Sequence, residues 1–209
     1  FNALNVHVRP LSSGPHVMGV PNDDPNALTR INLWGRAQKN KMDVNKHYYI
    51  ISRVKRIGEA DYEHHKLLRV HKAHDRIDVL PFDNLTPDTN YRFQIGSFAV
   101  PNTQIVDEDV ELIVADWTDA SGGTFKTPNP AANNLSFVFG SCRRYINIGG
   151  ITLFDSGAGA DRVFGAIFNQ TANDQNSFFL RLGDNVYFDP IGEHFIGQER
   201  RLNGMRKLY

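Results

Sequence analysis

The 209 residues include 23 Lys or Arg and 23 Asp or Glu, which gives a formal net charge of zero at pH 7. This balance argues against a nucleic-acid-binding patch, and no apolar run approaches the roughly 20 residues that span a bilayer. With 41% hydrophobic residues, the chain can bury a core and form one large or two small domains.

Residues 1–128 are expected to form an all-β sandwich of the immunoglobulin or fibronectin III type. Short segments rich in β-branched and aromatic residues alternate there with turn-forming stretches. The clearest of these segments are RINLWGRA, HYYIISRV, IDVLPF, YRFQIGSFAV and VELIVADW. In LTPDTNYRFQIG, Tyr91, Phe93 and Ile95 share one strand face, and Arg92 and Gln94 take the other. This spacing is similar to the tyrosine corner of such sandwiches.

Four histidines are concentrated in EHHKLLRVHKAHDR, at positions 64, 65, 71 and 74. Such a density is compatible with a zinc site. The segment falls within the expected sandwich, however, where the polar faces of strands and hairpins point to water. We therefore favour a solvated edge over a metal cluster.

The chain changes character at KTPNPAANN, where Pro, Asn and Ala replace the alternating patterns and indicate a linker. A second domain is expected at 134–209. LSFVFGSC is apolar on both faces, as is typical of a strand covered on both sides of a sheet. ADRVFGAIFNQ has the apolar spacing of a helix, and NSFFLRLGD is a second apolar run that ends at Asp184. The order is strand, helix, strand.

A right-handed crossover would make these two strands parallel. Cys142 and Asp184 would then leave the sheet at the same edge, where open α/β sheets bind ligands, and Tyr187 would reach the same space. A thiolate, a carboxylate and a phenolate together suit ferric iron. A bridging carboxylate can also hold two metal ions that clamp phosphoryl oxygens. Taken singly, the three residues also fit a packed thiol, a turn former and a rim aromatic.

FVFGSCRR followed by FFLRLGDNVYFDP, behind a domain that contains NLWGRA, resembles the start of a PhoD-type alkaline phosphatase or phosphodiesterase. The resemblance implies an αββα metallophosphoesterase domain that hydrolyses phosphate monoesters or diesters. It implies that Cys142 and Tyr187 ligate Fe³⁺ and that Asp184 bridges to one or two Ca²⁺ ions, with other divalent metals as substitutes. Apart from the resemblance, Arg143 and Arg144 could bind the phosphate ester through their guanidinium groups, and they could equally be solvated surface charges.

The family continues with a segment like W-D-D-H-D/E and later histidine motifs, and these 209 residues hold neither. We therefore interpret the chain as the amino-terminal part of a secreted or periplasmic enzyme, whose carboxy-terminal remainder supplies the other ligands. The final stretch EHFIGQERRLNGMRKLY has the apolar spacing of an amphipathic helix, and we expect a further segment to pack against its apolar face. Two alternatives stay open: a phospholipase D-like phosphodiesterase and a non-catalytic binding module.

Overall fold

The computed structural model describes residues 3–20, 23–37, 43–104, 106, 113–132, 136–140, 147–148, 151–152, 165–167, 169 and 177–181. The chain divides into two compact units, Phe1–Pro130 and Ala131–Tyr209.

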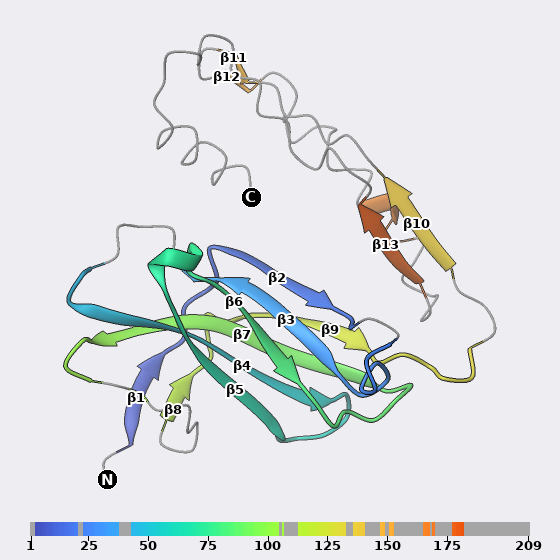
Figure 1. Cartoon of the computed structure of the whole chain (residues 1–209), viewed down its shortest axis with the longest axis horizontal. Coiled ribbons are helices and arrows are strands. Elements are labelled where there is room, and N and C mark those ends of the chain that lie inside the picture. The colour runs from blue at the N-terminus through green and yellow to red at the C-terminus, as the bar shows by residue number, and fades with distance from the viewer. Residues whose placement is uncertain are drawn as a thin grey trace. The chain divides into compact units, whose positions relative to one another are not determined.

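The first unit is built from β-strands that form two antiparallel sheets, as Figure 1 shows. The four-stranded sheet has the order β5-β4-β7-β9, with bounds His64–Val70, Lys46–Arg56, Asn90–Pro101 and Ser121–Lys126. The three-stranded sheet has the order β2-β3-β6, with bounds Ser13–Met18, Ile31–Arg36 and Ile77–Phe82. A short 3₁₀ helix, η1 (Lys72–His74), precedes β6. The predicted all-β, sandwich-like character of this part is confirmed.

One hydrophobic core joins residues of these two sheets. Its fully buried members include Leu33 and Leu80 of the three-stranded sheet and Ile50 and Ile95 of the four-stranded sheet. These side chains come from the segments whose apolar patterns predicted strands. Burial of each such side chain contributes about 1.5–3 kcal/mol relative to exposure.

A third, smaller layer covers the other face of the four-stranded sheet. It consists of β1 (Leu4–His7) and β8 (Ile113–Asp116), which pair in parallel. A second core, which includes Tyr49, Ile51 and Phe98, lies beneath this layer. The central strand β4 is therefore buried on both faces, which explains its continuous apolar run.

The predicted tyrosine corner is confirmed. Tyr91 is 1% exposed, and its hydroxyl oxygen accepts a hydrogen bond of 2.8 Å from the backbone N–H of Thr86. Its ring stacks on Phe125, with centroids 5.4 Å apart. Phe93 and Ile95 lie in the same buried cluster, as the alternation predicted.

The segment that links β1 to β2 crosses the outer edge of β7. Arg9 and Ser97 exchange two backbone hydrogen bonds there, of 2.8 and 2.9 Å. Gly96 makes this crossing possible, because a Cβ at that position would collide with the Arg9 carbonyl oxygen and the Val8 side chain. The crossing sets the position of β1 over the four-stranded sheet.

The second unit contains a parallel strand pair, β10 (Ser136–Gly140) and β13 (Ser177–Arg181). Residues 165–167 and 169, within the expected helix, are helical. The predicted parallel arrangement of the two strands is thus confirmed. A short antiparallel hairpin that the sequence did not indicate joins β11 (Asn147–Ile148) to β12 (Ile151–Thr152).

Candidate functional site

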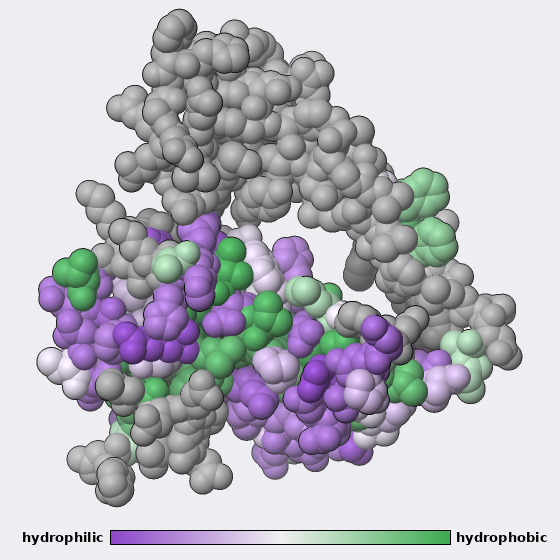
Figure 2. Space-filling model, in the orientation of Figure 1, coloured by the Kyte–Doolittle hydropathy of each residue, from purple (hydrophilic) through white to green (hydrophobic). Residues whose placement is uncertain are grey.

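The parallel pair β10–β13 is the framework of the site that the sequence predicts. Its register runs without a break from Ser136 opposite Ser177 to Gly140 opposite Arg181. The two strands therefore end at the same edge of the pair, opposite each other. Phe137 and Phe139 share one face of β10 and are 52% and 66% exposed, with ring centroids 6.3 Å apart. Figure 2 shows apolar surface at the place that β10 occupies in Figure 1.

The predicted site residues themselves lie outside the described residues. In the sequence, Cys142 and Arg143 follow Gly140 by two and three positions, and Asp184 follows Arg181 by three. Tyr187 comes three positions after Asp184. The carboxy-terminal stretch with helical spacing also falls outside the described part of the chain.

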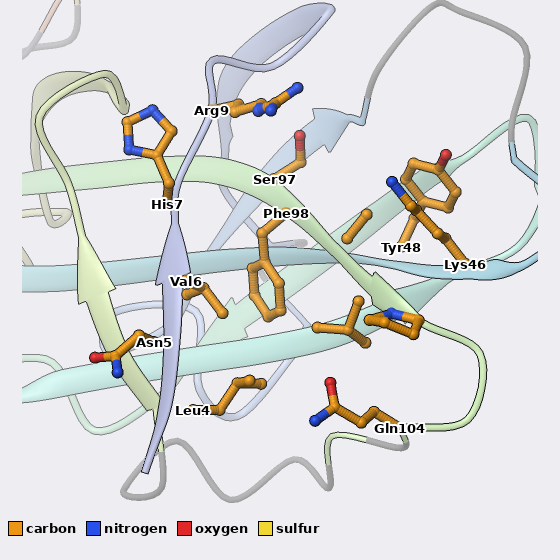
Figure 3. A pocket seen from close by; sticks show the side chains of 13 residues that line it. Leu4, Asn5, Val6, His7, Arg9, Lys46, Tyr48, Ser97, Phe98 and Gln104 are labelled. Atoms are coloured by element: carbon orange, nitrogen blue, oxygen red, sulfur yellow. The ribbon is translucent and has the colours of Figure 1, made fainter.

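A second candidate site is a pocket of about 330 Å³ in the first unit, shown in Figure 3. Its walls come from β1, from the first residues of β4 and from residues 97–101 of β7, and Gln104 completes it. Among the described residues, the lining includes Arg9 and Lys46 and no carboxylate. The pocket thus combines apolar strand residues with two cationic side chains.

The hydroxyl of Ser97 distinguishes this pocket. Ser97 is 1% exposed, and its Oγ has no hydrogen-bond partner among the described residues. A buried hydroxyl without a partner is destabilising, so such groups are rare in folded proteins. Near it, the Tyr48 hydroxyl oxygen accepts from the backbone N–H of Asp43 at 3.1 Å. Lys46 Nζ lies 4.0 Å from a carboxylate oxygen of Asp43, which is a weak, exposed ion pair.

The sequence analysis did not predict this pocket. The only local signal is Gly96-Ser97, which interrupts an otherwise apolar stretch of YRFQIGSFAV. A glycine inside a strand pattern indicates a close backbone approach or a bulge. Its other walls come from residues far away in the sequence.

His7, at the rim of the pocket, is held between two carboxylates. Its Nδ1 lies 2.8 Å from Asp116 and its Nε2 2.9 Å from Asp119. These hydrogen bonds raise the pKa of His7 above its ordinary value. The pKa of Asp116 falls to about 2, chiefly because the side chain and backbone of Thr118 donate hydrogen bonds to it and also because His7 does. His7 therefore fastens β1 to the segment around β8.

Arg53 occupies an aromatic setting on the face of the sheet that β1 and β8 cover. Its guanidinium carbon lies 4.1 Å from the ring centre of Tyr62 and 4.4 Å from that of Trp117. Two of its nitrogens donate to Gln94 Oε1, at 2.9 and 2.6 Å. Burial lowers the pKa of Arg53, and Tyr62 opposes this effect. These contacts hold the Arg53 guanidinium in place within the fold, so we do not assign Arg53 to a ligand site.

The four histidines predicted at a solvated edge lie on the edge strand β5 and around η1. His65, His71 and His74 are exposed, and His64 is half-buried. The rings of His71 and His74 meet edge to face, with centroids 6.3 Å apart. The expectation of a solvated edge is confirmed. Although His65 is exposed, partial desolvation of its ring lowers its pKa, as do the neighbouring Arg53 and His64.

Within the described part of the chain, no group of three or more His, Cys, Asp or Glu side chains is arranged to hold a metal ion. None of the helices in that part has both the length and the apolar character to cross a membrane.

No family model matches the chain, and no curated protein does. Among solved structures, it is similar to PhoD at 19% identity and a TM-score of 0.42, over 64% of this chain and 24% of the PhoD chain. It is also similar to a computationally redesigned β-sandwich protein, at 15% identity and a TM-score of 0.34, over 59% and 98% of the two chains. A third similarity is to the sensor domain of an anti-sigma factor of Pseudobacteroides cellulosolvens, at 14% identity and a TM-score of 0.31, over 56% and 97%. All three TM-scores are too low to establish a shared fold.

Proposed function

We propose that this chain belongs to a PhoD-like, metal-dependent phosphoesterase and contributes the first half of its metal site. The observation that carries the proposal is the unbroken parallel register that pairs Gly140 with Arg181. Each strand is followed within three residues by one of the chemically distinctive side chains, Cys142 and Asp184. Ligands of open parallel sheets bind at the carboxyl ends of the strands.

The donor set fits the proposed metals. Cys142 and Tyr187 offer a thiolate and a phenolate, which are anionic ligands suited to Fe³⁺. Asp184 offers a carboxylate, which suits both Fe³⁺ and the oxygen-preferring Ca²⁺ and can bridge them. Bound there, the ions would activate a water for attack on phosphorus and neutralise charge on the phosphoryl oxygens.

The chain's own residues would supply the positioning. Cys142, Asp184 and Tyr187 would hold the ions, and Arg143 would bind the phosphate group of a monoester or diester through its planar, two-pronged guanidinium. Three donors are too few for a two-metal centre. We therefore propose that a further polypeptide segment of the same enzyme provides the remaining ligands. The PhoD-type resemblance also leads us to propose a secreted or periplasmic location.

The test uses the intact natural protein that contains this chain, with p-nitrophenyl phosphate and bis(p-nitrophenyl) phosphate as substrates. Metal-dependent turnover of either ester is expected, with loss after chelation and recovery when Fe³⁺ and Ca²⁺ are returned together. Asp184→Asn should abolish turnover. Arg143→Gln should raise KM about tenfold, because a charge-assisted contact to phosphate is lost. Arg162→Gln, in the expected helix, is the matched control. Full turnover of Asp184→Asn would refute the proposal.

A further inference from the structure

The pocket of the first unit arises where two adjacent strands differ in length. β9 pairs with β7 only as far as Ile95 opposite Ser121, whereas β7 runs on to Pro101. Beyond Ile95, the outer edge of β7 is met by the crossing segment at Arg9 and is not followed further by β9. The space of about 330 Å³ lies along this stretch of β7, next to β1.

The pocket has a polar side and an apolar side because alternate residues of β7 point to opposite faces of the sheet. Ser97 pairs with Ile50 and lies on the face of the main core, where Tyr48 also points. Phe98 and Val100 point to the other face and belong to the second core. Leu4 and Val6 of β1 pack against that same core. A ligand in this pocket would therefore meet polar groups at one end and hydrocarbon at the other.

The polar side is positively charged. Arg9 is exposed, and its guanidinium has no side-chain partner among the described residues. Among the described residues, the ion-pair partner of Lys46 is Asp43, at the long distance of 4.0 Å. In Figure 3, the polar tips of Arg9, Ser97, Tyr48 and Lys46 lie above Phe98, Val6 and Leu4. His7 is already engaged by Asp116 and Asp119 and adds no free positive charge.

The hydroxyl of Ser97 gives the independent indication of a ligand. It is 99% buried, it lines the pocket, and it lacks a partner within the described chain. The Tyr48 hydroxyl accepts one hydrogen bond, so its own proton is available for donation. Two hydroxyl donors and two cations beside one space are complementary to an oxyanion.

We propose that this pocket binds a small amphipathic anion, with an oxyanion head group held by Arg9, Lys46 and Ser97 and a short hydrocarbon chain against Phe98 and Val6. Its volume is at the lower end of ligand pockets, which span about 300–1,000 Å³. A head group with a short chain fits this size. The site is independent of the proposed phosphoesterase centre, because all its residues belong to the first unit.

Titration calorimetry on the 209-residue chain, with chelator present, tests the proposal. The probes are hexanoate and hexyl phosphate, and hexanol and inorganic phosphate are their matched controls. Hexanoate, hexyl phosphate or both should bind at least about tenfold more tightly than hexanol, because only they present a charge to the cations. They should also bind more tightly than inorganic phosphate, because inorganic phosphate lacks the hydrocarbon chain. A preference between hexanoate and hexyl phosphate identifies the head group.

Substitutions locate the binding. Arg9→Gln and Lys46→Gln should each weaken binding about tenfold, because each removes a charge-assisted contact. Arg92→Gln, an exposed arginine of the same strand β7 outside the pocket, should leave binding unchanged. Lys46 is exposed, so its replacement keeps the test valid if Arg9→Gln does not fold.

Ser97→Ala separates a ligand contact from a structural role. It should raise the melting temperature of the free chain, because an unpartnered buried hydroxyl is removed, and it should weaken binding of the anion. A structural hydroxyl held by an ordered water would instead give a lower melting temperature and unchanged affinity, which would overturn the proposal. The proposal would also be overturned if no probe binds at about 10 mM, or if hexanol binds as tightly as the anions.

Discussion

Gly140 lies opposite Arg181 at the end of the parallel ladder that joins β10 to β13. The two residues are 41 positions apart in the sequence, and the pairing places these two strand ends at one edge of the sheet. A thiol and a carboxylate that follow these positions closely are thereby candidates for a shared site. The proposed metal centre depends on this relationship.

The crossing of the amino-terminal segment over β7 predicts a sensitive glycine. Gly96→Ala should lower the free energy of unfolding by about 1–3 kcal/mol, because a Cβ there meets the Arg9 carbonyl oxygen, a backbone atom that cannot easily move. Gly19→Ala is the control, since a Cβ at Gly19 has no neighbour within 4 Å. Urea denaturation followed by circular dichroism measures both. Equal effects of the two substitutions would show that the crossing is not tightly packed.

The hydrogen bonds of His7 to both Asp116 and Asp119 predict that the stability of the fold depends on pH. The folded-state pKa of His7 is raised above 6.5, so its contribution to stability is fully present below 6.5 and is lost as pH rises through the folded value. The urea midpoint of the wild type should therefore fall on this rise more steeply than that of His7→Gln. Proton NMR should give His7 a pKa above 6.5. A value at or below 6.5 would contradict the bracketed geometry.

The lowered pKa of Asp116 affects the stability of the fold at acidic pH. Its contribution is present above the ordinary value of 3.8 and is lost as pH falls toward about 2. Because Thr118 provides the largest cause, Thr118→Val should move the pKa of Asp116 upward, as carbon-detected NMR of the carboxyl would show. The same shift in a Thr124→Val control would count against a specific role of Thr118.

The sequence predicted those features whose signals are local. Tyr91, Phe93 and Ile95 revealed their shared face through simple alternation, and the tyrosine corner spans only a few residues. The parallel pair was predictable because strand, helix and strand follow one another and crossover handedness is nearly invariant.

The features that escaped sequence reasoning depend on distant segments. VELIVADW predicted the strand β8, but β1 is only four residues long, and no local pattern indicates its pairing with β8 or the contact of His7 with Asp116 across 109 positions. The pocket escaped for the same reason, since Arg9, Lys46 and Ser97 come from three separate strands or their flanks. An unpartnered hydroxyl is visible only once its surroundings are known.

The proposed phenolate ligand predicts a colour. Tyrosinate bound to Fe³⁺ should give a visible charge-transfer band in the intact, iron-loaded protein. Tyr187→Phe should remove the band, and Tyr145→Phe, which alters a tyrosine that we do not assign to the metal, should keep it. An unchanged band in Tyr187→Phe would mean that another group is the chromophore.

The donor count predicts that these 209 residues are inactive alone. In the proposed site, Cys142, Asp184 and Tyr187 would give one ion three ligands and would leave its neighbour with only the shared carboxylate. The isolated chain, loaded with Fe³⁺ and Ca²⁺, should show no turnover of p-nitrophenyl phosphate. The intact protein serves as the positive control. Metal-dependent turnover by a verified, uncontaminated sample of the isolated chain would refute the half-site interpretation.

The iron content of Cys142→Ser in the intact protein tests the central claim most directly. If the Cys142 thiolate is a ligand, elemental analysis should find iron well below the wild-type level, with phosphoesterase activity reduced in parallel. A thiol that only packs in the core would accept serine with a modest loss of stability and no change in metal. Wild-type iron content and turnover in Cys142→Ser would contradict the account.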